Sequence, residues 1–220
     1  MHEVTADVSR WLQAGKPVVL ATVIQTWGSA PRAAGGKMAI AVGDRLSGSV
    51  SGGCVEGAVA ECAAQVLRDG QPQLLHFGVA DETAWEVGLA CGGTIEVFVQ
   101  PLAPAMFEFV RAARENFQGT VRAIVVRGAA AALPGSELLL REDGAQAGSL
   151  GMALDAAALV EMQRALHNGK SKCVPIESTA GERIELFLDV LLPPATLIIV
   201  GGVHIACRCA RWPAHSATAL

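Results

Sequence analysis

The stretch that decides the fold covers residues 47–70 and reads SGSVSGGCVEGAVAECAAQVLRDG. A short strand-like segment ends in a glycine-rich turn, and from Val55 to Arg68 the apolar residues recur at the spacing of one helix face. Gly70 then provides a stop for that helix. The stretch therefore predicts a strand, glycine turn and helix, which is a building unit of α/β proteins.

The residues on either side extend this unit. A helix is expected before Gly15, and the apolar run Val18–Ile24 reads as a buried strand. A glycine-rich loop that contains Gly28-Ser-Ala-Pro-Arg32 leads into a second strand over Lys37–Val42. Thr94–Val99 predicts a further strand.

The same order of elements then recurs further along the chain. Val121–Val126 echoes Val18–Val23, Gly148–Leu150 echoes Gly48–Val50, Asp155–Leu166 echoes Glu56–Leu67, and Gly181–Phe187 echoes Gly92–Phe98. An internal repeat of this kind predicts an α/β fold class with two similar mixed units in tandem, joined near residue 117 through a helical linker over Pro104–Asn116.

We expect three segments, with boundaries at 1–102, 103–192 and 193–220. The last begins like a Rossmann unit, with an apolar strand before Gly201-Gly202. A dinucleotide fingerprint would place glycine where Val203 stands, and too few residues follow to complete a βαβ unit. We therefore expect an incomplete Rossmann start with a loosely ordered tail, and no dinucleotide site.

Composition excludes several classes of protein. The 220 residues include 17 Lys and Arg against 21 Asp and Glu, a net charge of −4 without a basic stripe, which argues against nucleic-acid binding. The longest apolar stretch, Leu191–Val203, is interrupted by proline and glycine and predicts no membrane span. Met1–Glu3 does not open a signal peptide, so a cytoplasmic setting with reduced cysteines is expected.

Comparison of the two units separates scaffold from site. Three features occur in the first unit only: Gly28–Arg32, Ser51–Cys54 and Cys91. The second unit has Ala153 in place of Cys54 and Ala180 in place of Cys91. Any site chemistry is therefore expected in the first unit.

Cys54 follows two glycines at the predicted N-terminus of a helix, where backbone N–H groups and the helix dipole favour a thiolate. A thiolate is a nucleophile and a soft metal ligand. Cys91 lies in a second glycine turn, and parallel strands would bring both turns to one sheet edge. With Arg32, these turns predict a pocket for an anion and a metal. The alternative for Cys54 is a small buried residue at a tight turn, but glycines on both sides of the loop expose the backbone and favour the functional interpretation. Arg32 is equally describable as an ordinary surface arginine.

Other candidates have structural explanations. Cys62 lies on the core side of the predicted helix, and His76 falls in a strand-like run. Glu56 in the first helical turn complements the helix dipole. Trp27 and Trp85 suit core or rim positions.

The motifs resemble those of the XdhC/CoxI group of xanthine dehydrogenase accessory proteins. The resemblance rests on the loop ending at Arg32 and on three runs, Gly48-Ser-Val-Ser-Gly-Gly-Cys-Val-Glu56, Gly88-Leu-Ala-Cys-Gly-Gly93 and Ile198-Ile-Val-Gly-Gly-Val-His-Ile-Ala206. It implies a maturation factor, without catalytic residues of its own, that binds molybdenum cofactor transiently, protects it and helps insert its sulfurated form into a molybdenum hydroxylase. The implied partners are apo xanthine dehydrogenase or a related hydroxylase and a cysteine desulfurase.

The residues and the resemblance together predict one set of site residues. Cys54 would contact the metal, and the cofactor-binding residues would be Arg32, Ser51, Gly52, Gly53, Cys54, Cys91, Gly92 and Gly93. Two alternatives stay open, a thiol-dependent enzyme with Cys54 as its nucleophile and a truncated fragment without function. We also expect a homodimer, because an incomplete third segment would leave apolar surface near the second unit.

Overall fold

The computed structural model describes residues 1–193 except 2, 44, 79–92, 129–131 and 179–180. Its first half contains α1 (Thr5–Gln13), β1 (Val18–Trp27), β2 (Lys37–Ala41), β3 (Arg45–Gly48), α2 (Glu56–Asp69), β4 (Gln73–Phe77) and β5 (Thr94–Pro101). Its second half contains α3 (Pro104–Glu115), β6 (Thr120–Arg127), β7 (Glu137–Arg141), β8 (Gln146–Gly148), α4 (Met152–Asn168), β9 (Lys172–Glu177) and β10 (Arg183–Leu191).

The two halves have the same topology. The strand orders are β3-β2-β1-β5-β4 and β8-β7-β6-β10-β9, so each element of the first half has a counterpart in the second. The predicted fold class of two similar α/β units in tandem is confirmed. The structure also shows that α3, expected as a linker, is the counterpart of α1 and opens the second unit.

Every strand pairing in the described part of the chain is antiparallel. The expectation that parallel strands bring the glycine turns together is therefore wrong. The physical reason is the connectivity: β1, β2 and β3 follow one another through loops that are too short for the crossover that a parallel pair requires. The helix α2 carries the chain across the sheet towards its opposite edge, where β4 and β5 complete the strand order.

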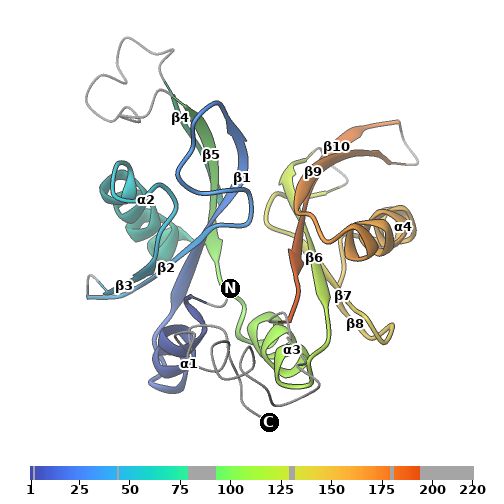
Figure 1. The fold of residues 1–220 in the computed structure, drawn as a ribbon, viewed down its shortest axis with the longest axis horizontal. Coiled ribbons are helices and arrows are strands. Elements are labelled where there is room, and N and C mark those ends of the chain that lie inside the picture. The colour runs from blue at the N-terminus through green and yellow to red at the C-terminus, as the bar shows by residue number, and fades with distance from the viewer. Residues whose placement is uncertain (2, 44, 79–92, 129–131, 179–180, 194–220) are drawn as a thin grey trace, which may run out of the picture.

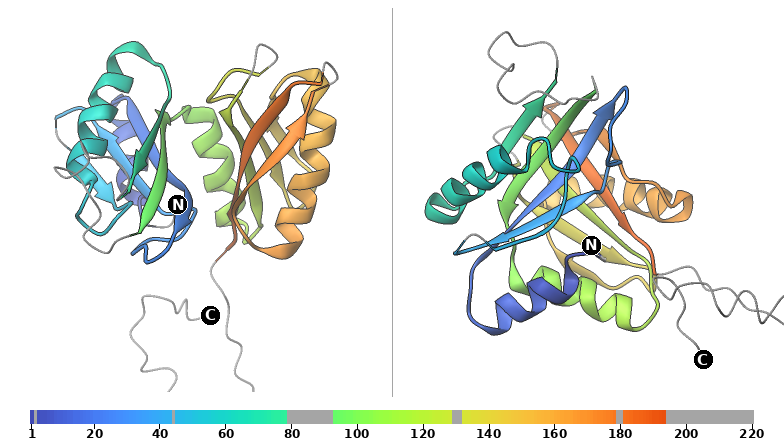
Figure 2. Two further views of the ribbon diagram at one scale, coloured as in Figure 1. Left: turned by 90° about the horizontal axis from the view of Figure 1, so that it is seen from above. Right: turned by 60° about the vertical axis from the view of Figure 1, so that its left-hand side comes forward.

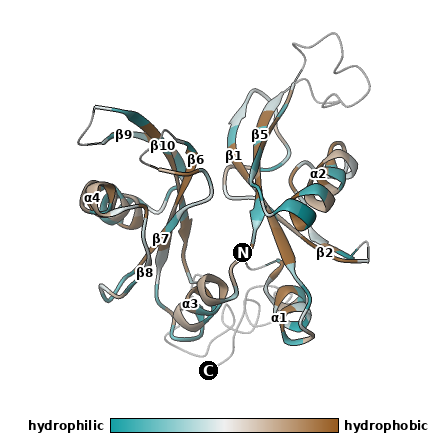
Figure 3. Cartoon of the chain, turned by 180° about the vertical axis from the view of Figure 1, so that it is seen from behind, coloured by the Kyte–Doolittle hydropathy of each residue, from teal (hydrophilic) through white to brown (hydrophobic). Residues whose placement is uncertain are grey.

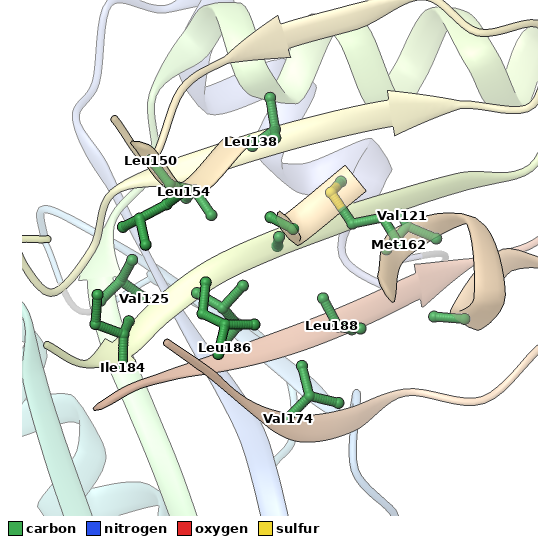
Figure 4. Close-up of a cluster of buried hydrophobic side chains, with 14 of the residues drawn as sticks. Val121, Val125, Leu138, Leu150, Leu154, Met162, Val174, Ile184, Leu186 and Leu188 are labelled. Carbon is green, nitrogen blue, oxygen red and sulfur yellow. The ribbon is translucent and has the colours of Figure 1, made fainter. Parts of the chain in front are cut away.

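The two sheets face each other, with α2 on the outer face of the first and α4 on the outer face of the second (Figures 1 and 2). Each outer face has its own apolar core. In the second unit Leu154 and Met162 of α4 pack on Val121, Leu138 and Leu186 of the sheet (Figure 4). Alternation along each strand sends the neighbouring residues to the inner face.

The inner faces pack against each other through a small apolar cluster with a polar surround. Ile24 and Phe98 of the first sheet meet Ile124, Val126 and Phe187 of the second. In Figure 3 hydrophobic residues make up much of β5, β6 and β10. The helices α1 and α3 lie together at one end of this seam, and Phe107 of α3 joins the core under α1.

Candidate functional site

Cys54 lies in an open glycine loop between β3 and α2. The side chain of Cys54 is exposed, and the described residues offer its sulfur no hydrogen-bond partner. Gly52 has a φ of 82° and Gly53 a φ of 120°, conformations that disfavour any residue with a Cβ. The two glycines therefore shape a loop that presents the thiol to solvent.

The carboxylate of Glu56 organises this loop from within. Its Oε1 accepts the backbone N–H of Ser51 at 2.9 Å and of Gly52 at 3.1 Å. Its Oε2 accepts the N–H of Gly53 at 2.9 Å, and the hydroxyls of Ser49 and Ser51 also donate to the carboxylate. Burial alone would raise the pKa of Glu56, but these hydrogen bonds outweigh it and lower the pKa to about 2.

These contacts change how an anion could be held. The sequence predicted that the loop amides would suit the anionic end of a ligand, whereas in the structure they donate to Glu56. The N–H groups of Cys54 and Val55 donate to the hydroxyl oxygen of Ser51, each at 3.0 Å. What the loop leaves open to a ligand is therefore the thiol of Cys54 and the bare backbone at Gly52 and Gly53.

In the second unit the equivalent segment is a helical turn instead of an open loop. Asp155 takes the place of Glu56 and accepts the hydroxyl of Ser149 and the N–H of Leu150, each at 2.7 Å. There α4 begins at Met152, three residues before Asp155, whereas α2 begins at Glu56 itself. The position of Cys54 thus corresponds to Ala153, inside a helical turn that the first unit replaces by an open loop.

The loop that carries Arg32 packs beside the glycine loop. A Cβ placed on Gly52 would lie 3.6 Å from the Cβ of Pro31. Arg32 pairs with Glu3, and this contact lowers the pKa of the Glu3 carboxyl. The side chain of Arg32 is 30% exposed. A hollow of about 360 Å³ runs along this loop between Glu3 and Lys37. Arg32 therefore offers a cation at the rim of a hollow close to the glycine loop.

Gly93 reaches the same loop from the other side. A Cβ at Gly93 would lie 2.3 Å from the carbonyl oxygen of Ser29, so only glycine allows this close approach. The antiparallel pairing of Trp27 with Thr94 places the two segments together. The structure thus brings Gly52 and Gly93 against one loop, while the predicted residues Cys91 and Gly92 lie outside the described residues.

Two further cysteines are built into the scaffold. Cys62 packs against the core under α2, and burial raises the pKa of its thiol. Cys173 is half-buried, and its Sγ lies 3.6 Å from the carbonyl oxygen of Ile24. Burial is the main cause that raises the pKa of Cys173 to about 12, and Glu185 adds to it. The position of Cys62 agrees with the prediction that it serves packing. Of the three cysteines in the described part of the chain, only Cys54 is exposed.

His76 is an edge residue, as its strand-like sequence suggested. It lies on β4 with its Nδ1 2.9 Å from Glu96 Oε1, and its side chain is 60% exposed. No group of three or more histidine, cysteine or acidic side chains in the described part of the chain could hold a metal ion together. A metal at Cys54 would therefore have to bring most of its ligands with it.

Sequence reasoning missed the polar residues of the seam between the sheets. Lys37, Arg122 and Asp189 are all buried there, and Arg122 is paired with Glu137. A signal was present, because Asp189 interrupts the apolar run Ile184–Leu192. A charged residue in the middle of a buried strand requires a partner, which here comes from the other half of the chain.

Within the ranges that the structure describes, no helix is long and apolar enough to cross a membrane. The incomplete Rossmann start, the predicted tail and Trp85 lie outside the described residues.

The fold and the loop together define a class: a protein of two tandem α/β units with an exposed thiol on a glycine turn of the first.

Part of the chain is similar to a known family. Residues 11–78 match the model of the XdhC and CoxI family. This match agrees with the resemblance seen in the motifs. The segment contains the Arg32 loop, the glycine loop and Cys54.

Two curated relatives come from Escherichia coli strain K12. The chain is 35% identical over 95 residues to the molybdenum cofactor insertion chaperone PaoD, which is 43% of this chain and 29% of PaoD. It is 34% identical over 83 residues to the uncharacterized protein YqeB, which is 38% of this chain and 15% of YqeB. The alignments thus span less than a third of these relatives.

A solved structure shares the fold. A crystal structure titled as a xanthine dehydrogenase (BH1974) from Bacillus halodurans superposes with a TM-score of 0.62 at 18% identity. The match covers 87% of this chain and 53% of that one, so the shared architecture extends over both units.

Proposed function

We propose that this protein is an accessory factor for a molybdenum enzyme, which binds molybdenum cofactor transiently at the Cys54 loop and protects it. The observation that carries the proposal is the open loop itself. The first unit exposes a thiol where the second unit has a closed helical turn with Ala153, and the family match contains that loop. The similarity to a named molybdenum cofactor insertion chaperone supports the same role.

The chemistry of the loop suits the metal end of molybdenum cofactor. At the phosphate end it changes which residues we expect to bind. Molybdenum cofactor has a dithiolene-bound metal and a phosphate. Cys54 Sγ, once deprotonated, is a soft ligand suited to the metal. Because Glu56 accepts the loop amides, the phosphate would be held by Arg32 on the adjacent loop, in exchange for its partner Glu3, with Gly52 and Gly53 allowing close approach.

The proposal extends to the partners that this role requires. The protein would pass the sulfurated cofactor to apo xanthine dehydrogenase or a related molybdenum hydroxylase, after a cysteine desulfurase has supplied the sulfur. Both encounters would take place in the cytoplasm. The exposed position of Cys54 leaves its sulfur accessible to a cofactor carried by another protein.

The test is cofactor retention in matched cysteine variants. The parent, Cys54→Ala and Cys62→Ala are purified from cells that make molybdenum cofactor, and bound molybdenum and pterin are assayed. We expect Cys54→Ala to retain less by roughly tenfold or more, as expected for a lost metal contact, with the fold intact. Cys62→Ala is the control, because that thiol packs on the core of the same helix. Equal retention in the parent and Cys54→Ala would remove Cys54 from the site.

A transfer assay tests the finer part of the proposal. Loaded protein is mixed with an apo molybdenum hydroxylase and a cysteine desulfurase, and the recovered hydroxylase activity is followed. We expect the parent to restore activity and Cys54→Ala to fail. Full restoration without any added protein would show that transfer does not need it.

A further inference from the structure

The turn that carries Arg32 has an equivalent in the second unit, and the two turns differ in charge. Gly36 ends the turn of the first unit and Ser136 that of the second, and each donates its N–H at 3.0 Å to the carbonyl three residues earlier. Arg32 lies four residues before Gly36, and Ala132 lies four residues before Ser136. Ala132 is buried. The scaffold therefore forms this turn without an arginine.

The carboxylate that pairs with Arg32 is also missing from the second unit. Val4 is the N-cap residue of α1 and Ala103 that of α3, so Glu3 corresponds to Leu102. Leu102 is buried and packs in the apolar core under α1. Both members of the Glu3–Arg32 pair thus have apolar counterparts, and the fold of a unit requires neither charge.

Gly36 gives the side chain of Arg32 a surface to lie against. A Cβ placed on Gly36 would come within 3.4 Å of the Arg32 Cβ and 3.5 Å of its Nε. The second unit has Ser136 at this position together with Ala132. Glycine and arginine therefore occur together in the first unit, where they hold a guanidinium in a defined place at the rim of the hollow.

Of the described residues that line this hollow, Arg32 is the cation within reach of a ligand. Lys37 also lines it, but its Nζ is held at 2.8 Å by the buried Asp189. Met1 lines it as well, and burial is the main cause that lowers the pKa of the Met1 amine to about 5, so this amine is largely neutral at pH 7. The side chains of Arg32 and Glu3 are 30% and 56% exposed, so a solute can reach both.

We infer that Glu3 is an internal competitor for this hollow: its carboxylate pairs with Arg32 in the absence of ligand and gives way to a phosphate monoester. The inference rests on the proposed function, for which it names the phosphate subsite and the group that regulates it. An exposed ion pair contributes little free energy, so a doubly charged phosphate can replace the carboxylate. Val4 beside Glu3 is fully buried, which confines the exchange to the Glu3 side chain. When the phosphate leaves, Glu3 pairs with Arg32 again, and this return favours release of the cargo.

The first test measures the affinity of the full chain for inorganic phosphate by phosphorus NMR titration at neutral pH and fixed ionic strength. We expect Glu3→Gln to bind phosphate about threefold more tightly than the parent, because the competing carboxylate is gone. Arg32→Gln should bind at least about fivefold more weakly than Glu3→Gln. Glu61→Gln, which removes one exposed negative charge from α2, is the control without effect. Equal affinity in the parent and Glu3→Gln, or in Glu3→Gln and Arg32→Gln, would overturn the inference.

A double variant tests whether Glu3 acts through Arg32. In the Arg32→Gln background, the further change Glu3→Gln should alter the phosphate affinity by less than about twofold, because the carboxylate no longer has a shared partner to compete for. A gain as large as in the parent background would show that Glu3 only repels anions at a distance, which contradicts the exchange.

Two further readouts separate this inference from the proposed function. Cys54→Ala should bind inorganic phosphate as tightly as the parent does, and a loss of binding there would place the anion at the glycine loop and overturn the assignment. Glu3→Gln purified from cells that make molybdenum cofactor should retain at least as much cofactor as the parent. If the parent retains cofactor and Cys54→Ala does not, while Glu3→Gln and the parent bind phosphate equally, the exchange is refuted and the proposed function stands.

Discussion

Lys37 Nζ lies 2.8 Å from Asp189 Oδ1, and the two side chains, each 1% exposed, join β2 of the first unit to β10 of the second. Lys37 also donates to the carbonyl oxygen of Gly35 at 2.9 Å. Burial lowers the pKa of Lys37, and the adjacent Asp189 opposes that shift. Because both charges have lost their hydration, each depends on the other.

Removal of one member of this pair should therefore be costly. We expect Lys37→Met or Asp189→Leu alone to lower the free energy of unfolding by about 3 kcal/mol, because a buried charge is left without a partner. The double variant should lose much less than the sum. Urea unfolding of the parent and the three variants gives the coupling energy, and additive effects would show that the pair does not hold the units together.

The Glu56 carboxylate should make stability depend on acidity. Its pKa is lowered from 4.5 to about 2 in the folded chain, so its ionised form stabilises the fold above pH 4.5. That contribution is lost as the pH falls towards 2. Since solvent screens this partly exposed group, we expect Glu56→Gln to cost about 1–2 kcal/mol at neutral pH and almost nothing near pH 2. Unfolding by denaturant across this range measures the difference.

Asp155 provides the matched control for this prediction. It accepts the hydroxyl of Ser149 and one backbone N–H, that of Leu150, whereas Glu56 accepts several amides. Asp155→Asn should therefore cost less than Glu56→Gln at neutral pH. An equal cost at the two positions would mean that the extra amide contacts of Glu56 contribute nothing.

The sequence predicts the local elements better than their pairing. The apolar runs of β1 and β5 and the helical spacing of α2 are visible from residue order, because they reflect burial on one element at a time. The edge strands β3 and β8 are short, with four and three residues, and their mostly exposed residues give no apolar run. Strand direction depends on contacts between distant segments, and the expectation of parallel strands was wrong for that reason.

The site was predictable in part. The difference between Cys54 and Ala153 marked the loop from sequence alone. The capture of its amides by Glu56 could not be read from residue order, because the side-chain rotamer decides whether a carboxylate in the first turn points to solvent or back into the loop. The repeat of α1 in α3 is hard to see from sequence, because the two helices share a buried i, i+3 spacing but no residue motif.

Gly48 and Gly148 occupy equivalent turns in the two units, so substitutions there test whether the turns of the repeat depend on glycine in the same way. Gly48 has a φ of 79°, and a Cβ there would lie 2.3 Å from the carbonyl oxygen of Lys37; at Gly148 the corresponding contact is 2.3 Å from that of Glu137. We expect Gly48→Ala and Gly148→Ala each to lower the free energy of unfolding by about 2 kcal/mol or more.

Gly43 is the control for these two positions. It has a φ of 85° with nothing within 4 Å of a built Cβ, so Gly43→Ala carries only the backbone strain, about 1 kcal/mol. Thermal unfolding of the three variants should place Gly43→Ala nearest the parent. If Gly43→Ala were as damaging as the others, the close backbone approach at the turns would be of no consequence.

Thiol reactivity should separate Cys54 from the two scaffold cysteines. At about pH 8 we expect iodoacetamide to label the exposed Cys54 at least about tenfold faster than Cys173, whose pKa of about 12 keeps it protonated. Cys62 should also react slowly, since burial raises the pKa of its thiol. Peptide mapping by mass spectrometry follows each site, and in urea the three rates should converge. Of these three cysteines, only Cys54 should lose its labelling in protein loaded with molybdenum cofactor, whereas unchanged labelling would show that the cofactor does not cover this sulfur.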